Sequence, residues 1–298
     1  MSGFDVVDDL CIQDLAFAVS LLPSSWTLLV VDKDRFLKRC PVKRIIFDSI
    51  INLFLVYDLT SAAGYLQVSV PVVMQLVIRR YRPSDRDTVR ALFSTGIQEH
   101  ITPCFHNRMA TPFCLAITAA LCVAGYLLSS VLGAVVLAAA WMGLVYYCCH
   151  KIYSGFVKER LLTDMQDIPG NYLSRPGDDF WVAEAKLDGR VQILGMVAVK
   201  AKQSGKEKYG ELMRMIISPL CRRMGLGFRL AQTVVDYCKE QGFSKVVLET
   251  SAIQTAAVGL YEKLGFRHVL SPSITEFPSW VVMLANVKVL RMEKQLSA

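Results

Sequence analysis

A run of 41 residues, from Met109 to Cys149, contains no Asp, Glu, Lys or Arg. Of these residues 33 are hydrophobic, which is far too many for the surface of an ordinary globular domain. A single helix of this length would extend about 60 Å, twice the thickness of about 30 Å of a bilayer's hydrocarbon core. One straight membrane span is therefore a poor explanation, and we expect the run to turn back on itself.

Small and polar residues cluster only in the middle of the run, between Gly125 and Gly133. A turn near Ser129 and Ser130 predicts a hydrophobic helical hairpin, with arms of about 19 residues that match the length of a membrane span. Basic residues flank the run on both sides, so the positive-inside rule favours the cytosol for both ends and requires an even number of crossings. The turn is too short to carry an opposing charge bias, so the sequence does not fix which membrane face holds the domain. The alternative is a hairpin buried inside a large soluble protein.

The rest of the composition excludes several classes of protein. The net charge is +7, but no dense basic stripe is present, so we expect no nucleic-acid partner. The nine Cys form no Cys-x-x-Cys pair and the four His share no ligand spacing, so we expect no metal site. Residues 1–73 show no chemistry and are interpreted as an N-terminal extension of unknown role. Residues 74–298 are interpreted as one domain that is interrupted by a membrane hairpin at 109–149.

Outside the uncharged run, the hydrophobic pattern alternates between strand and helix periods. A Leu-Asp-Gly sequence at 187–189 predicts the turn of a strand hairpin. Gly242 follows the most regular amphipathic helix at the position where helices usually end. Expected strands cover 76–81, 180–186, 191–200, 211–218, 245–249 and 281–290, and expected helices cover about 85–99, 151–173, 228–241 and 255–264.

A glycine-rich turn lies between the strand at 211–218 and the helix at 228–241. In Arg222-x-x-Gly225-x-Gly227, two glycines let a ligand approach the backbone, and the start of a helix offers N–H groups to a phosphate. The turn is not a Walker loop, since no Gly-Lys-Ser/Thr follows, and it lacks the third glycine of a dinucleotide fingerprint. The spacing alone indicates either a phosphate-bearing ligand or a plain turn.

A second motif, Leu260-Tyr261-Glu-Lys-Leu-Gly265-Phe266, follows about 35 residues later. Together, the two motifs resemble the GNAT superfamily of acetyl-CoA-dependent N-acetyltransferases. The uncharged run and the segments 162–168 and 179–184 are similar to the camello group, the N-acetyltransferase-eight family. The resemblance covers roughly 76–295. It implies an α/β GNAT fold, in which a mixed, mostly antiparallel sheet is flanked by helices, with the hydrophobic hairpin inserted.

The resemblance also implies roles for individual residues, with acetyl-CoA as cosubstrate and an amine as acceptor. Tyr261 occupies the family position of the acid that protonates the leaving thiolate. Gln254 stands where many members carry Asn. The residues expected to bind acetyl-CoA are Met215, Ile216, Ile217, Arg222, Arg223, Met224, Gly225, Leu226, Gly227, Phe228 and Gln254.

Two further residues come from the sequence of the strand itself. Glu211 is the candidate general base, because a carboxylate at the start of this strand can accept a proton from the amine. Its alternative is a solvated strand end. Arg214 is the candidate partner for a carboxylate on the acceptor, and its alternative is a surface arginine.

Three functions remain open at this stage. The first is a membrane-associated N-acetyltransferase for a small amino-acid derivative, where the family resemblance implies a cysteine S-conjugate and the endoplasmic reticulum. The second is the same chemistry on aspartate or on protein lysines. The third is a non-catalytic membrane protein that binds acyl-CoA or serves as a scaffold.

Overall fold

The computed structural model describes residues 76–128, 130–187 and 190–296, and the interpretation of residues 1–73 lies outside this part of the chain. The described residues divide into two compact units. One consists of residues 112–139, and the other combines residues 76–111 with 140–296.

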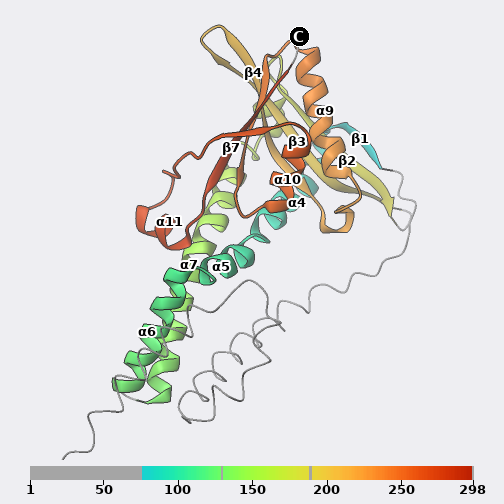
Figure 1. The fold of residues 1–298 in the computed structure, drawn as a ribbon. Helices are drawn as coiled ribbons and strands as arrows, with labels where there is room; N and C mark the ends of the chain where they lie inside the picture. Colours follow the sequence, from blue (N-terminus) through green and yellow to red (C-terminus); the bar gives the residue numbers. More distant parts are fainter. Residues whose placement is uncertain (1–75, 129, 188–189, 297–298) are drawn as a thin grey trace, which may run out of the picture. The chain divides into compact units, whose positions relative to one another are not determined.

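A mixed seven-stranded sheet forms the centre of the larger unit, and the strand order is β1-β2-β3-β4-β5-β7-β6. Neighbouring strands are antiparallel, except that β4 and β5 are parallel. Figure 1 shows α9 lying against the sheet, with β4 and β7 on one side of it and β1 on the other in this view. The strands are β1 (Val77–Arg80), β2 (Asp179–Leu187), β3 (Arg190–Ser204), β4 (Glu207–Ile217), β5 (Lys245–Ser251), β6 (Arg267–Leu270) and β7 (Val289–Gln295). The predicted α/β class with a mostly antiparallel sheet is confirmed.

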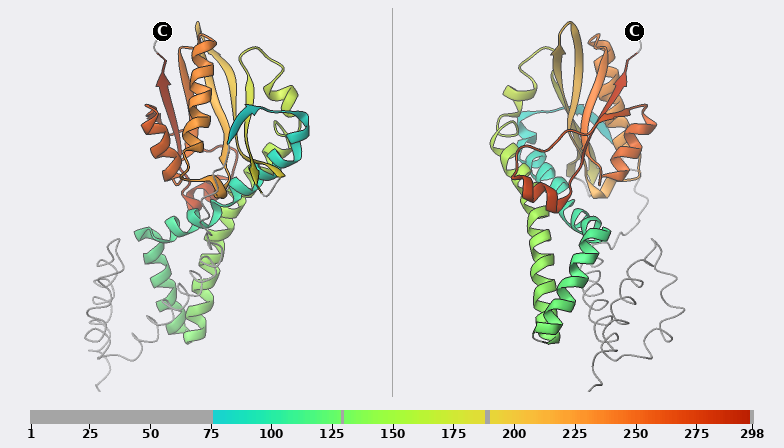
Figure 2. Two further views of the ribbon diagram at one scale, coloured as in Figure 1. Left: turned by 90° about the vertical axis from the view of Figure 1, so that its right-hand side faces the viewer. Right: turned by 60° about the vertical axis from the view of Figure 1, so that its left-hand side comes forward.

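Helices cover both faces of this sheet, because alternate strand residues are apolar on each side. On one face, α9 (Leu226–Glu240) and α10 (Thr255–Lys263) enclose a core that includes Leu212. On the other face, α4 (Arg86–Gln98) and α8 (Ile168–Tyr172) pack over Met196 and Ile216. Figure 2 shows the strands between α9 and these two helices. Short 3₁₀ turns, η3 (Pro83–Asp85) and η4 (Pro219–Cys221), precede α4 and α9.

The smaller unit contains α6 (Pro112–Leu128) and the first part of α7 (Val131–Leu162). These two helices lie on either side of the predicted turn, of which residue 129 is outside the described residues. A Cβ atom on Gly125 would lie 2.6 Å from the backbone of Ala134, which shows how closely the two helices approach. Small residues at such a contact are typical of helices that pack in membranes. By length and composition, α7 is the one described helix that could cross a membrane on its own.

The structure differs from the sequence predictions in three places. First, the predicted helix over 151–173 has the wrong bounds. Its first part belongs to α7, which continues without a break to Leu162, and its last part is a separate short helix, α8. Second, the predicted strand over 281–290 is wrong, because α11 (Ser279–Ala285) precedes β7. Its β-branched residues suggest a strand, yet Val281 and Ala285 are buried with helical spacing. Third, α5 (Ile101–Met109) and β6 are elements that the pattern did not predict.

Candidate active site

The parallel pair β4 and β5 opens into a gap between the strands. Their register covers only Gly210↔Val246, Glu211↔Val247 and Leu212↔Leu248. Both strands continue past these pairs, β4 to Ile217 and β5 to Ser251. Within the described chain, no pairing of β4 with β5 extends beyond Leu212, so backbone groups of both strands face an opening here.

A β-bulge lies in β4 beside this opening. Met213 pairs with Ala198 and Ile216 pairs with Met196, so Arg214 and Met215 together oppose a single residue of β3. Arg214 has a φ of 56°, which is in the left-handed region that non-glycine residues rarely adopt. The bulge turns the strand and directs Arg214 toward the α4 side of the sheet.

Contacts of the Arg214 side chain explain why this unusual backbone is stable. Its Nε lies 2.8 Å from Oδ2 of Asp164 and 3.1 Å from the hydroxyl of Tyr172, and that hydroxyl also donates to Asp164. The guanidinium lies 5.7 Å from the ring centres of both Phe93 and Phe156. The residue expected to contact the acceptor's carboxylate therefore already has a half-buried carboxylate partner, Asp164, in the chain.

Tyr261 approaches the opening from the other face of the sheet. It is 6% exposed, and its hydroxyl donates to Sδ of Met215 over 3.4 Å. Burial raises the pKa of Tyr261 above its ordinary value of about 10, so the phenol is protonated at neutral pH. At the start of the same helix, Gln254 accepts a hydrogen bond of 2.7 Å from the hydroxyl of Thr250 on β5. The structure thus brings two predicted residues, Tyr261 and Met215, into contact.

Glu211 lies in the paired part of β4, before the opening. Its side chain is 23% exposed and its Oε2 lies 3.5 Å from Nζ of Lys202 on β3. Its neighbour Leu212 belongs to the core beneath α9, so Glu211 faces the opposite side of the sheet. Glu211 and Tyr261 therefore approach β4 from opposite faces of the sheet. Glu211 precedes the bulge in β4, and Tyr261 contacts Met215 within the bulge.

The glycine-rich turn has the geometry of an anion site. Gly225 is the N-cap of α9, has a φ of 76°, and leaves the first turn of the helix without a side-chain cap. A Cβ atom on Gly225 would meet no other atom within 4 Å, so the backbone is open to a ligand there. A Cβ atom on Gly227 would lie 2.9 Å from Leu260, so this glycine allows α9 and α10 to pack closely.

The other predicted residues of the turn divide into exposed and buried positions. The side chains of Arg223, Met224 and Phe228 are exposed, whereas Leu226 is fully buried in the core. Arg222 forms an ion pair with Glu99, at the end of α4, and donates to the carbonyl oxygen of Ile217 over 3.4 Å. Leu226 can therefore contribute only its backbone to a ligand site.

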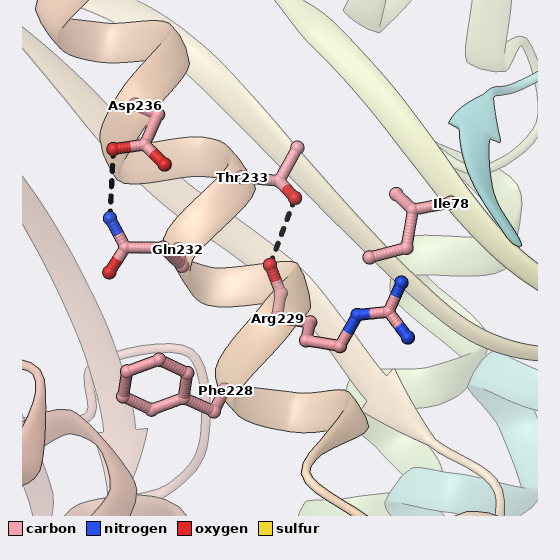
Figure 3. Close-up of a pocket in the computed structure, with 6 residues that line it drawn as sticks. All are labelled: Ile78, Phe228, Arg229, Gln232, Thr233 and Asp236. Atoms are coloured by element: carbon pink, nitrogen blue, oxygen red, sulfur yellow. Dashed lines mark hydrogen bonds between the residues drawn. The ribbon is translucent and has the colours of Figure 1, made fainter. Parts of the chain in front are cut away.

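An open groove runs along the outer side of α9 near β1 (Figure 3). Gln232 donates to Asp236 over 2.8 Å, and Thr233 donates to the carbonyl of Arg229 over 2.9 Å. Of the predicted site residues, only Phe228 lines it. The groove is formed by Ile78, Phe228, Arg229, Gln232, Thr233 and Asp236, and it is separate from the opening between β4 and β5.

Four residues contact predicted site residues but were not predicted themselves, namely Asp164, Tyr172, Glu99 and Thr250. Asp164 lies 50 residues before Arg214, and Glu99 lies 123 residues before Arg222. Such long-range pairs leave no periodicity or spacing in the sequence. Among the residues that the structure describes, no three His, Cys, Asp or Glu side chains are grouped as metal ligands.

Comparison with known proteins identifies the family. Residues 146–266 match the model of the acetyltransferase (GNAT) family. The probable N-acetyltransferase camello of Xenopus laevis is 34% identical over 200 residues, which cover 65% of this chain and 86% of that protein. The N-acetylaspartate synthetase of Homo sapiens is 35% identical over 213 residues, covering 70% of this chain and 68% of that protein. N-acetyltransferase 8 of Homo sapiens is 33% identical over 193 residues, covering 64% of this chain and 83% of that protein. The chain therefore belongs to the GNAT acetyltransferases, which are acetyl-CoA-dependent acyltransferases, and within them to the camello and N-acetyltransferase 8 family.

Proposed function

We propose that the protein is a membrane-associated N-acetyltransferase that acetylates the amine of a small amino-acid derivative, such as a cysteine S-conjugate. The observation that carries the proposal is the opening between β4 and β5, which has a buried, protonated Tyr261 beside it. The catalytic domain comprises 74–298 and is interrupted by a membrane hairpin at 109–149. The proposal includes the endoplasmic reticulum as the membrane, and it requires no metal.

The residues around the opening fit acetyl-CoA, which supplies the acetyl group as a thioester. The uncapped first turn of α9 and the open backbone at Gly225 suit a pyrophosphate. Arg223 is exposed beside this turn, and Arg222 can contribute if it leaves Glu99. The segment Met215–Ile217, which has no partner on β5, offers backbone groups to the pantetheine arm and to the carbonyl oxygen of the acetyl group.

Glu211 and Tyr261 have complementary roles in this proposal. An alkyl amine has a pKa of about 10.4, so only about one molecule in 2,500 is neutral at pH 7. Glu211 accepts the proton from the amine, directly or through water, on the α4 side of the sheet. Tyr261 donates its phenolic proton to the leaving sulfur on the α10 side, and its raised pKa keeps that proton in place until then.

A second candidate acceptor is aspartate, because one relative is named an N-acetylaspartate synthetase. In that case a cation must bind the second carboxylate. Arg214 is already paired with Asp164, so it can bind the acceptor only if this pair opens. Protein lysines are the other alternative acceptor, and a non-catalytic acyl-CoA-binding or scaffold protein is the alternative from a different class.

The release of free CoA by the full chain, measured with a panel of amines, tests the proposal. The panel contains a cysteine S-conjugate, aspartate and a lysine peptide. We expect turnover with the conjugate, and turnover only with aspartate or only with the peptide would reassign the acceptor. Binding of acetyl-CoA without turnover on any amine would instead support the non-catalytic alternative. The variant Glu211→Gln should lower turnover at neutral pH, whereas Glu240→Gln, at the far end of α9, should leave it unchanged.

A further inference from the structure

The short helix α11 has an outward apolar face that the catalytic domain does not cover. Val281 and Ala285 are buried, and Arg108 of α5 donates from Nε to the carbonyl oxygen of Leu284 over 2.7 Å, so the helix is fixed from its inner side. On the outer side, Trp280 is 46% exposed and Met283 is 68% exposed. These two residues are three positions apart and therefore share one face of the helix.

The segment before α11 packs along α7, and its successive residues contact α7 at successively earlier positions. Glu276 accepts a hydrogen bond of 2.7 Å from Arg160. The Phe277 ring lies over Gly155, where a Cβ atom would be 2.8 Å away. The Trp280 ring centre lies 5.9 Å from Nζ of Lys151. The segment thus moves along α7 toward its amino end and delivers Trp280 to the level of Lys151.

Lys151 marks a boundary in the sequence, because it is the first Lys or Arg after the uncharged run. Its Nζ also lies 5.7 Å from the ring centre of Tyr147, which is half exposed. Lysine and exposed aromatic residues that follow an apolar span are typical of the level at which a helix leaves the hydrocarbon core. If the hairpin lies in a membrane, Trp280 is therefore at the membrane surface.

The charges around α11 suit a phospholipid surface. No Asp or Glu occurs between Glu276 and Glu293, whereas Lys288 follows the helix and Lys151 lies against Trp280. An exposed tryptophan and methionine can enter the apolar part of a lipid interface, and the lysines beside them can contact its anionic headgroups.

We infer that α11 inserts the face formed by Trp280 and Met283 among the phospholipid headgroups of the membrane that holds the hairpin. This inference rests on the membrane association in the proposed function. It goes further, because it makes a segment between β6 and β7 a second membrane contact of the catalytic domain.

The same contact places the entrance of the candidate site near the lipid. After α11 the chain returns to β7, where Val289 pairs with Ser251 at the end of β5. The Ser251 hydroxyl also lies 3.4 Å from that of Tyr153, two residues beyond Lys151 on α7. The open end of β5 and the lipid-facing α11 therefore belong to one continuous region. An amphipathic amine dissolved in the interface can reach the opening without crossing bulk water.

Tryptophan fluorescence of the full chain, reconstituted in phospholipid vesicles, tests this inference. The chain has four Trp, of which Trp181 is buried in the sheet and Trp141 lies in α7 within the uncharged run. The vesicles contain lipids brominated either near the carbonyl end or near the methyl end of the acyl chains. Bromine quenches only a tryptophan that touches it, and each variant removes one contribution while Trp26 stays constant.

We expect Trp280→Phe to lose quenching by the lipids that carry bromine near the carbonyl end. Trp181→Phe should lose none, and Trp280→Phe with Met283→Trp should recover it, because position 283 lies on the same face. Equal acetyl-CoA affinity in all variants shows that they are folded.

Two results would overturn the inference, and they differ in what else they affect. If Trp141→Phe removes lipid quenching and Trp280→Phe does not, the hairpin is in the membrane but α11 is not. In that case, protection of Trp280 from aqueous iodide would show that protein covers it instead. If neither variant changes lipid quenching, the membrane association in the proposed function fails as well.

Discussion

At the scale of single residues, Tyr261 carries the most specific chemical prediction. Tyr261→Phe should lower kcat by about 10²- to 10⁴-fold, the usual contribution of a general acid. The Kd for acetyl-CoA should change little, because the lost hydrogen bond goes to a weak acceptor, Sδ of Met215. Steady-state kinetics and calorimetry separate the two effects. Tyr237→Phe is the matched control, since Tyr237 lies on α9 and packs against Trp181 of β2. Equal losses of kcat in both variants would remove Tyr261 as the acid.

Asp164 gives a prediction for stability and its pH dependence. Burial alone would raise the pKa of Asp164, but the hydrogen bond and charge of Arg214 outweigh it and hold that pKa below the ordinary value. The carboxylate therefore stabilises the folded state above about pH 4, and this contribution is lost as the pH falls through the lowered pKa. Asp164→Asn should lower the free energy of unfolding by about 1–3 kcal/mol at neutral pH and weaken its decline below about pH 4.

Chemical unfolding in detergent, measured at neutral and acidic pH, checks this prediction. Asp236→Asn is the control, because Asp236 is an exposed residue of α9 with one local hydrogen bond from Gln232. A parallel pH dependence in wild type and Asp164→Asn would show that this ion pair does not contribute to acid sensitivity.

The residues themselves were predictable to different degrees. Tyr261 and Gly225 lie in short motifs, so local sequence is sufficient to single them out as candidate site residues. Arg214 was identified as a candidate, but its partner Asp164 was not, because the fold alone brings these residues together. The direction of the Arg214 side chain depends on a bulge in β4, and no residue in that strand predicts a bulge from its type.

At the scale of elements, the two ends of α9 provide a matched pair of glycines. Gly225 and Gly242 have φ values of 76° and 70°, and a Cβ atom on either would meet no other atom within 4 Å. Replacing either glycine should therefore cost a similar amount, about 1–2 kcal/mol, from the left-handed backbone. Gly225→Trp should abolish acetyl-CoA binding, because its side chain fills the start of the helix. Gly242→Trp should retain it.

Calorimetry with acetyl-CoA and unfolding measurements on both variants test this comparison. Retained affinity in Gly225→Trp would show that the candidate acetyl-CoA site is placed incorrectly. Loss of affinity in both variants would indicate a general effect of the destabilised helix rather than a blocked site.

The prediction of elements succeeded where a pattern repeats and failed where a local signal misleads. The helices at 226–240 and 255–263 repeat an apolar stripe over two or more turns, so their sequences predict them. The helix α11 spans only seven residues, which is too short to show a period. The uncharged run ends at Cys149, but this change in charge does not end the helix. Helix α7 continues beyond it because lysine and histidine are compatible with a helix.

At the scale of the whole molecule, the sheet constrains the topology of the chain in a membrane. Strand β1 precedes the hairpin and β2 follows it, yet they pair from Val77↔Glu184 to Arg80↔Trp181. An epitope inserted directly before Leu76 and one added after Ala298 should therefore lie on the same side of the membrane. In sealed microsomes, protease should cleave both epitopes or neither.

Detergent is the control, because it should make both epitopes accessible. Protection of one epitope and cleavage of the other would contradict an even number of crossings. An even number of crossings stays a prediction, whereas the fold class could be predicted from the sequence, since it depends on the order of long patterns. The side of the membrane could not, because the turn at 129–130 is too short to carry a charge bias.

The pairing of β1 with β2 also has a consequence for how the protein is made. About 100 residues separate Arg80 from Trp181, so at about 5–20 residues per second the ribosome needs roughly 5–20 s between the two strands. During this interval β1 lacks its neighbour, while α4, α5 and the uncharged run are synthesised. Strand β1 can therefore join the edge of the sheet only after the uncharged run has been synthesised and β2 has followed it. Under the proposed membrane association, insertion of the hairpin precedes the pairing of β1 with β2 and so delays completion of the catalytic domain.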